Sequence, residues 1–318
     1  MGNNHKRNKH HRGGKRTNRW LKIVVVALVI FFAIDGIIIA KMYNDAKNAV
    51  GTTYHKVKHN SERSATRTIS NGKPFSILLL GTDTGDYGRT YKGRTDTIMV
   101  AVVNPNTKKT TLVSIPRDTK VAIPGHGFEN KINSAYTYGG TSMAMNIVQS
   151  YLNVPVDHYI EMNMGGLVQL SSVLGPVKVY NDLDFTSRGY HFKKGTVTLN
   201  KKNILAFTRM RYEDSRGDYG RQLRQRNVLE ALVKKIATVR GITKYQDILS
   251  ALSSNMKTDI TFNEMKKIAT KYRSADKVKQ IQLQGYGKMI DGISFQVVPQ
   301  KNVDAVTKEL RAALELNK

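Results

Sequence analysis

The chain contains no cysteine, which excludes disulfide bonds, thiolate metal sites and a cysteine nucleophile. Acidic residues are scarce: 24 Asp and Glu stand against 51 Lys and Arg, for a formal net charge of +27. This excess predicts an anionic partner, which can be nucleic acid, lipid headgroups or an acidic polymer. Apolar residues are not scarce, at 40% of 318 residues. A real core, in one large domain or two small ones, is therefore expected.

The N-terminus predicts a membrane anchor. Residues 1–22 carry eight Lys and Arg and no acid, and residues 21–40 are almost wholly apolar. A run of about twenty residues matches the roughly 30 Å of a bilayer core. Because the positive charge precedes the run, we expect a single-pass type II protein with a cytoplasmic tail (1–20), one transmembrane helix (21–40) and the rest outside the cell membrane. A cleavable signal peptide is the alternative, but no clear small-x-small cleavage site follows.

The remainder predicts a spacer and one α/β domain. Residues 41–73 are polar and mixed, so we expect a short helical extension of the anchor followed by a flexible spacer. The folded domain is predicted over residues 74–318. Near-continuous apolar runs over residues 75–80, 97–104 and 109–115 predict strands of a sheet covered on both faces.

Further strands and helices alternate, which is typical of a layered α/β domain. We find no internal repeat. Further strands are expected over residues 158–162, 177–180, 195–199, 278–283 and 295–298, and helices over 141–152, 164–174, 201–207, 223–240, 245–253, 262–272 and 303–316.

Residues 209–226, RMRYEDSRGDYGRQLRQR, hold six arginines. On an extended strand Arg209 and Arg211 would share a face, and on a helix Arg221 and Gln225 would share a face. A strand, a tight turn at residues 217–220 and a helix could thus aim three guanidiniums and an amide at one point. Guanidinium forks suit phosphate oxygens. The alternative is a solvated basic helix start with local ion pairs.

Two acids flank a glycine-rich loop upstream. Asp83 follows one predicted strand, and Asp96 precedes the next. If these strands are antiparallel neighbours, the two carboxylates meet at one edge of the sheet. Two carboxylates, phosphate oxygens and water are the usual ligands of Mg²⁺, whereas transition metals more typically bring in imidazole. The alternative is that both are turn residues, but Arg94 and Arg117 also lie at strand ends beside them.

Three segments together resemble the LytR–CpsA–Psr family. They are FSILLLGTDTGDYGRTYKGRTDTIMVAVVNPNTKKTTLVSIPRDTKV (75–121), KINSAYTYGG (131–140) and the arginine-rich stretch 209–226. The order of basic tail, anchor, spacer and domain also matches. The resemblance implies a mixed central β-sheet sandwiched between helices, with an apolar pocket for a lipid.

The resemblance also implies a function. Members are membrane-anchored phosphotransferases of Gram-positive bacteria that move a glycopolymer, such as teichoic acid or capsule, from a polyprenyl-pyrophosphate carrier onto peptidoglycan. The implied metal is Mg²⁺, with Mn²⁺ as its substitute, held by Asp83 and Asp96. The implied pyrophosphate-binding residues are Arg94, Arg117, Lys131, Arg209, Arg211, Arg221 and Gln225.

A mechanism follows as a hypothesis. A pyrophosphate held by arginines and one Mg²⁺ is poised for phosphoryl transfer. Asp214 and Asp218 are the candidate general bases, although Asp218 also suits a helix N-terminus. The rivals are a pyrophosphate hydrolase, a non-catalytic surface protein that binds anionic wall polymers, and a transcription regulator. We expect no nucleic-acid partner, because no recognised DNA-binding module is present.

Overall fold

The computed structural model describes residues 40–83, 93–236 and 244–316. The chain divides into two units, Met1–Asp45 and Ala46–Lys318. The predicted cytoplasmic tail and all but the last residue of the predicted transmembrane helix lie outside the described residues. Within the described part, no helix combines the length and apolarity needed to cross a membrane.

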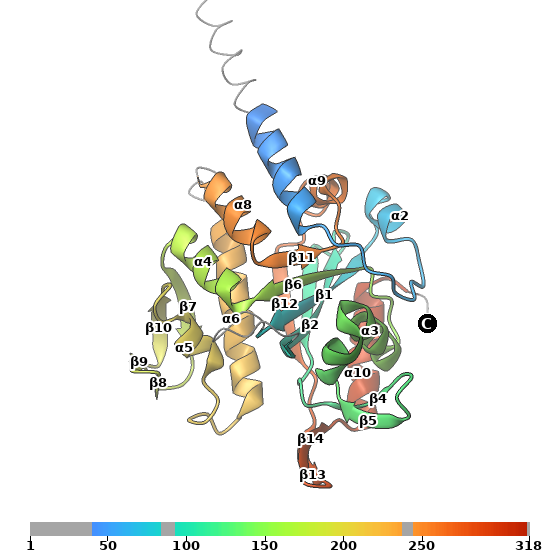
Figure 1. The fold of residues 1–318 in the computed structure, drawn as a ribbon, viewed down its shortest axis with the longest axis vertical. Helices are drawn as coiled ribbons and strands as arrows, with labels where there is room; N and C mark the ends of the chain where they lie inside the picture. The colour runs from blue at the N-terminus through green and yellow to red at the C-terminus, as the bar shows by residue number, and fades with distance from the viewer. Residues whose placement is uncertain (1–39, 84–92, 237–243, 317–318) are drawn as a thin grey trace, which may run out of the picture. The chain divides into compact units, whose positions relative to one another are not determined.

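A six-stranded mixed sheet forms the centre of the second unit (Figure 1). Its order is β11 (Met256–Thr258), β6 (His158–Asn163), β1 (Phe75–Thr82), β2 (Thr95–Asn104), β3 (Lys109–Ser114) and β12 (Lys277–Gln282). Strands β1, β2 and β3 run antiparallel in succession, while β6 runs parallel to β1 and β12 parallel to β3. A parallel pair of strands needs a long crossover connection. The long segments that precede β6 and β12 provide such connections, so the sheet contains both parallel and antiparallel pairs.

Helices cover both faces of this sheet, as the sequence predicted. Alternate residues of β2 point to opposite faces. Val100 and Val102 join a core with α3 (Ser134–Leu152) and α10 (Gln300–Ala313). On the other face Met99 and Ala101 pack near α6 (Asp218–Ile236), and α2 (Ala65–Ser70) and α9 (Phe262–Lys271) cover the start of β1.

A second hydrophobic core lies in a lobe beside α6 (Figure 1). It is formed by α4, α5, α8, a two-stranded sheet and a small hairpin, together with residues of α6. The bounds are α4 (Met164–Leu174), β7 (Val177–Asn181), β8 (Phe185–Ser187), β9 (Tyr190–Phe192), β10 (Gly195–Leu199), α5 (Ile204–Arg209) and α8 (Tyr245–Ser253). Two further hairpins are β4 (Lys120–Ile123) with β5 (Phe128–Lys131) and β13 (Tyr286–Ile290) with β14 (Ile293–Val297).

Most elements agree with the predictions within a few residues, and α4, β10 and α8 agree in both bounds. The start of α3 was predicted wrongly. It begins at Ser134 because the pair Gly139-Gly140 forms a kink inside the helix, where Gly140 has φ +65°, rather than a boundary. The hairpin β4–β5, the strands β8, β9, β11 and β13, and helix α2 were not predicted.

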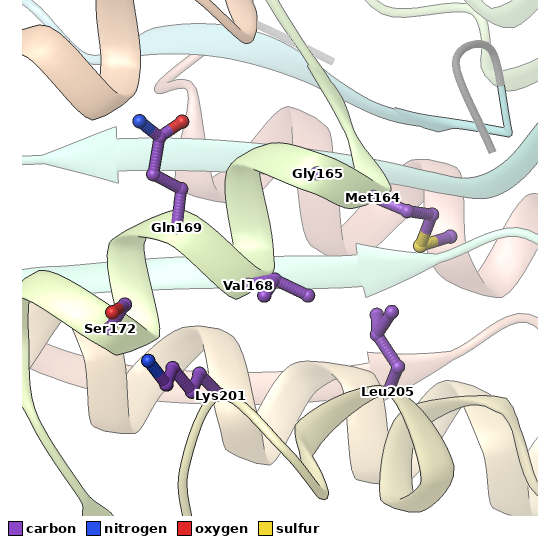
Figure 2. Close-up of a pocket in the computed structure, with 7 residues that line it drawn as sticks. All are labelled: Met164, Gly165, Val168, Gln169, Ser172, Lys201 and Leu205. Carbon is purple, nitrogen blue, oxygen red and sulfur yellow. The ribbon is translucent and has the colours of Figure 1, made fainter. Parts of the chain in front are cut away.

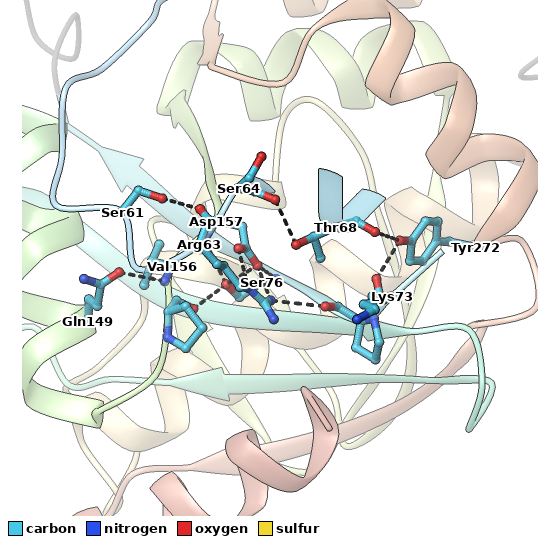
Figure 3. Close-up of polar contacts among 12 residues, drawn as sticks. Ser61, Arg63, Ser64, Thr68, Lys73, Ser76, Gln149, Val156, Asp157 and Tyr272 are labelled. Atoms are coloured by element: carbon cyan, nitrogen blue, oxygen red, sulfur yellow. Dashed lines mark hydrogen bonds and ion pairs between the residues drawn. The ribbon is translucent and has the colours of Figure 1, made fainter. Parts of the chain in front are cut away.

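The segment predicted as a spacer is packed against the domain from Ala46 onward. Thr53 and Ile69 are buried. Figure 3 shows the main polar attachment: Asp157 accepts hydrogen bonds from Arg63 Nε (2.8 Å) and Nη2 (2.5 Å) and from the Ser76 backbone N–H (2.8 Å). The polar composition that suggests a solvated linker therefore supplies hydrogen-bond partners to the start of the sheet.

Candidate functional site

Asp83 and Asp96 lie at the same edge of the sheet. Strands β1 and β2 are antiparallel, and the register shifts between Gly81↔Thr97 and Thr82↔Thr95. Asp96 therefore sits at an irregularity inside β2, not before it as predicted. Asp83 directly follows β1, and its Oδ1 accepts a hydrogen bond from the Arg94 backbone N–H at 3.0 Å. The antiparallel pairing that the metal hypothesis required is present.

Arg117 connects the acids to the neighbouring loop. Its Nη1 forms an ion pair with Asp96 Oδ1, and its Nε lies 3.7 Å from Asp118 Oδ2. The other oxygen of Asp118 lies 3.0 Å from Lys131 Nζ. Asp118 thus joins Arg117 to Lys131. Asp118 was not among the predicted site residues, although it adjoins Arg117 in the chain. Its contact with Lys131 depends on where β5 places that lysine, which the sequence does not show.

Helix α6 presents two site residues to the start of β2. Arg221 Nη2 donates to the Asp96 carbonyl oxygen at 3.2 Å and lies 2.6 Å from Asp218 Oδ1. One turn later, Gln225 Oε1 accepts a hydrogen bond from Thr97 Oγ1 at 3.0 Å. The predicted shared face of Arg221 and Gln225 is therefore present and is directed at β2.

Arg209 and Arg211 are not on a strand, which corrects the prediction. Arg209 is the last residue of α5, and Arg211 follows Met210 in the irregular segment before α6. Helix α6 also begins at Asp218, so the predicted turn over residues 217–220 ends at Gly217, where φ is +55°. The apolar pattern predicted that α5 ends at Phe207, but the helix continues to Arg209, the first residue of the arginine-rich stretch.

The remaining three arginines are structural. Arg216 and Arg224 both bind the buried carboxylate of Asp214, and Arg224 Nη2 also donates to the Met210 carbonyl oxygen at 2.6 Å. Arg226 donates to uncharged oxygens on β3 and β12, and burial lowers its pKa to about 10. The alternative of local ion pairs thus holds for part of the stretch. Asp214 is buried and bound by these two arginines, whereas Asp218 lies beside Arg221. Asp218 is therefore the candidate base that remains.

Burial and charge act in opposite directions on the two central guanidiniums. Burial lowers the pKa of Arg117, but the carboxylates of Asp96, Asp118 and Asp218 outweigh it, so the pKa is raised. For Arg221, burial outweighs the raising effect of Asp218 and Asp96, and the positive charges of Arg117 and Arg211 also lower the pKa, so the pKa is lowered. Arg211 therefore lies close enough to Arg221 for mutual repulsion, which a shared anionic ligand would relieve.

Two buried donors suit such an anion. Within the described region, Nε of Arg117 and Nε of Arg221 are buried and make no hydrogen bond. A buried donor without an acceptor costs free energy unless a ligand satisfies it. Phosphate oxygens match guanidinium edges in both charge and geometry.

The two carboxylates fit one hard cation. No set of three or more His, Cys, Asp or Glu side chains that could hold a metal occurs among the described residues. Mg²⁺ commonly takes only one or two carboxylates and completes its shell with water and substrate phosphate. Asp83 and Asp96 at one sheet edge, beside Arg117 and Arg221, agree with that donor set.

A pocket of about 420 Å³ lies between α4 and α5. Figure 2 shows Val168 of α4 and Leu205 of α5 pointing into the space between the two helices. Met164 lines it directly after β6, whose last residue Asn163 pairs with Thr82, the residue before Asp83. Leu205 also lies one helical turn before Arg209. The elements that line the pocket are therefore connected to the strand end before Asp83 and to Arg209.

Comparisons with known protein sequences and solved structures point to the same family. The model of the LytR_cpsA_psr family matches residues 37–312. The "polyisoprenyl-teichoic acid–peptidoglycan teichoic acid transferase TagU" of Enterococcus faecalis is 48% identical over 290 residues, which cover 91% of this chain and 95% of the relative. The crystal structure of Bacillus subtilis TagU matches with TM-score 0.62 and 37% identity over 77% of this chain and 99% of that one. A structure of TagT bound to LIIa-WTA matches with TM-score 0.65 and 28% identity, covering 82% and 95%.

Proposed function

Because the chain belongs to the LytR–CpsA–Psr family, we propose that it transfers a glycopolymer, teichoic acid in the first instance, from a polyprenyl-pyrophosphate carrier onto peptidoglycan. The observation that carries the proposal is that the Nε donors of Arg117 and Arg221, which flank Asp96, are buried and make no hydrogen bond within the described site. A binding protein for wall polymers needs basic residues, but it has no use for two acids placed among them.

In this proposal the arginines bind the pyrophosphate of the donor. Arg117 would reach it from the loop after β3 and Arg221 from α6, and Arg211, Arg209 and Arg94 would add positive charge around it. Lys131, the last residue of β5, is held by Asp118 beside this group of arginines. Positioning and charge stabilisation are the main means by which enzymes accelerate phosphoryl transfer.

Asp83 and Asp96 would hold Mg²⁺ or its substitute Mn²⁺. When bound, the cation would neutralise developing charge on phosphate oxygens. The ion pair between Asp96 and Arg117 holds that carboxylate in place, and the backbone of Arg94 holds Asp83. These contacts preorganise both acids before any ligand arrives.

The pocket between α4 and α5 would receive the carrier chain near its pyrophosphate. Apolar side chains of Met164, Val168 and Leu205 line it together with the polar side chains of Gln169, Ser172 and Lys201. Arg209, on the same helical face as Leu205, would then lie where the chain meets its phosphate. Residues 21–40 would anchor the protein as a single-pass type II membrane protein, with the catalytic unit outside the cell, where lipid-linked polymer and peptidoglycan both occur.

The reaction exchanges one phosphorus–oxygen bond for another. A peptidoglycan hydroxyl attacks the phosphorus next to the glycopolymer, a new phosphodiester forms, and the bond to the bridging oxygen breaks to release polyprenyl phosphate. The hydroxyl proton must be accepted, and we propose Asp218 for this role. Its carboxylate lies 2.6 Å from both Arg221 Nη2 and Gln222 Nε2, so it is already positioned beside the phosphate-binding guanidinium.

The test is release of polyprenyl phosphate by the full-length protein in detergent, with a lipid-linked saccharide, peptidoglycan oligomers and Mg²⁺. We expect Arg117→Ala to lower kcat by about 10²-fold or more, and Asp96→Ala to abolish metal dependence. Arg67→Ala, an exposed arginine on α2, is the control and should retain wild-type rates. Equal rates in all variants would refute the assignment, and release without any linked product would favour hydrolysis.

A further inference from the structure

An exposed aromatic cluster extends from the hairpin β4–β5. The ring centroids of His126 and Tyr138 lie 4.5 Å apart, those of His126 and Phe128 5.7 Å, and those of Phe128 and Tyr138 6.1 Å. Phe128 is 45% exposed and Tyr138 is 43% exposed. Two large rings gathered on a surface, rather than buried in the core, indicate a binding site.

The cluster is held in place by its supporting elements. Val121 and Ile123 on β4 are buried in the main core, so the hairpin cannot move independently of it. Tyr138 lies in the first turns of α3, before the kink at Gly140. The Asn130 side-chain amide donates to the Tyr138 hydroxyl at 3.4 Å. The rings therefore form a preorganised surface with an amide and a hydroxyl at its border.

The position of the hairpin relates the cluster to the phosphate site. At the base of the hairpin, Lys120 pairs with Lys131, which contacts Asp118. Phe128 lies three residues before Lys131, about 10 Å away by strand rise. In the sheet order β6-β1-β2-β3, the pocket between α4 and α5 adjoins β6, whereas the hairpin follows β3. The cluster is thus on the side of the acids away from the proposed carrier pocket.

The segment that carries the cluster has no net charge, and Arg117 directly precedes it. Residues 118–138 contain two acids and two lysines, and these form the ion pairs Lys120–Glu129 and Lys131–Asp118. The chain as a whole has a net charge of +27, so a segment without net charge next to an arginine-rich site is unlike the rest of the molecule. An anionic polymer would be bound by unpaired cations, so a neutral aromatic surface favours uncharged sugar rings.

We propose that His126, Phe128 and Tyr138 form a subsite for the glycan strand of the acceptor, with Asn130 as its polar contact. A pyranose ring presents C–H groups on one face that stack on aromatic rings, and its hydroxyl and acetamido groups can bond Asn130 and the Tyr138 hydroxyl. The proposal rests on the proposed function in naming the acceptor, but the binding itself requires no transfer. Bound sugars on this surface would lead the attacking hydroxyl towards Arg117.

Direct binding tests the subsite without any donor. The probe is an uncharged β-1,4-linked N-acetylglucosamine tetramer, titrated calorimetrically into the full-length protein in detergent. We expect Tyr138→Ala and Phe128→Ala each to weaken binding on the order of tenfold, as loss of one stacking contact implies. Phe128→Trp keeps the stacking surface and should bind like wild type. Tyr180→Ala removes an exposed aromatic side chain from β7 and is the matched control.

Kinetics provide the second measurement. In the transfer assay, Tyr138→Ala should raise KM for the peptidoglycan acceptor and leave KM for the lipid-linked donor unchanged. Tetramer binding that is equal in wild type, Tyr138→Ala and Phe128→Ala, or absent from wild type, overturns the subsite. A raised donor KM with unchanged acceptor KM also overturns it, by assigning the surface to the donor polymer. Tetramer binding without any transfer activity would instead refute only the proposed function.

Discussion

Replacing Asp214 by Asn tests how the arginine-rich segment is held. Asp214 is 1% exposed, and its oxygens accept hydrogen bonds from Arg224 Nη1 at 2.6 Å and from Arg216 Nε and Nη2 at 2.9 Å. The Asn side chain has nearly the same shape but no charge. The substitution therefore leaves the Arg224 guanidinium, only 2% exposed, without a counter-charge.

The expected loss is large for one substitution. Removing one partner of a buried ion pair costs about 3–5 kcal/mol. For a unit of this size, 1 kcal/mol changes Tm by about 2–4 °C, so the melting temperature should fall by on the order of 10 °C. Asp182→Asn is the control, because Asp182 pairs with the same Arg216 at the surface, where the side chains are 37% and 39% exposed. Such a pair contributes about 1 kcal/mol or less.

The dependence of stability on acid pH tests the contribution of the Asp214 carboxylate independently. Burial alone would raise the pKa of Asp214, but hydrogen bonds from Arg216 and Arg224 lower it to about 2. Because the folded-state pKa lies below the unfolded value of about 3.9, this stabilisation is complete above that value and is lost as the pH falls towards 2. The difference in unfolding free energy between wild type and Asp214→Asn should shrink over this range. A variant as stable as Asp182→Asn at neutral pH would refute the reasoning.

Three further substitutions probe the site and its supports. Arg221→Lys keeps the charge but loses the planar guanidinium, whose Nη2 contacts both the Asp96 carbonyl and the Asp218 carboxylate and whose buried Nε would face the phosphate. We therefore expect kcat to fall by about 10²-fold. Steady-state rates within twofold of wild type would contradict this. Gly220→Ala places a Cβ 1.8 Å from Asp214 Oδ2, so the melting temperature should fall, although Ala is favoured over Gly in a helix by about 1 kcal/mol. A raised Tm would contradict this, because it would show that the Asp214 side chain moves away without cost. Asp157→Asn loses the charged contacts with Arg63 (Figure 3). The loss should lower the free energy of unfolding by about 2 kcal/mol or more and speed proteolysis near residue 63. Unchanged cleavage and an unchanged melting temperature would show that Asp157 does not hold this segment.

The strand ends that carry the acids could be predicted from the sequence. Apolar runs marked β1, β2 and β3, and the short Asn-Pro-Asn-Thr turn requires β2 and β3 to be antiparallel. Arg221 and Gln225 followed from helical spacing alone. In each case the information is local, because periodicity and turn residues determine which face a side chain occupies.

Other features depend on contacts between distant residues. The segment around Arg63 is polar enough for a linker, and the contact that holds Arg63 to the sheet is made with Asp157, 94 positions away. Asp214 lies among three arginines in the sequence, and spacing does not reveal that Arg216 and Arg224 bind it while Arg221 turns to β2. The extended conformation assumed for Arg209 and Arg211 was wrong because α5 continues through Arg209. Tertiary packing decided these cases.

The most direct test of the central claim is the chemical linkage of the product. The full-length protein would be incubated with a lipid-linked, ³²P-labelled saccharide and peptidoglycan oligomers, and the products would be digested to muropeptides and identified by mass spectrometry. We predict a labelled phosphodiester between saccharide and muropeptide, formed with stoichiometric polyprenyl phosphate and absent in Arg117→Ala. Labelled saccharide phosphate released into solution, with no labelled muropeptide in the presence of acceptor, would contradict the transferase.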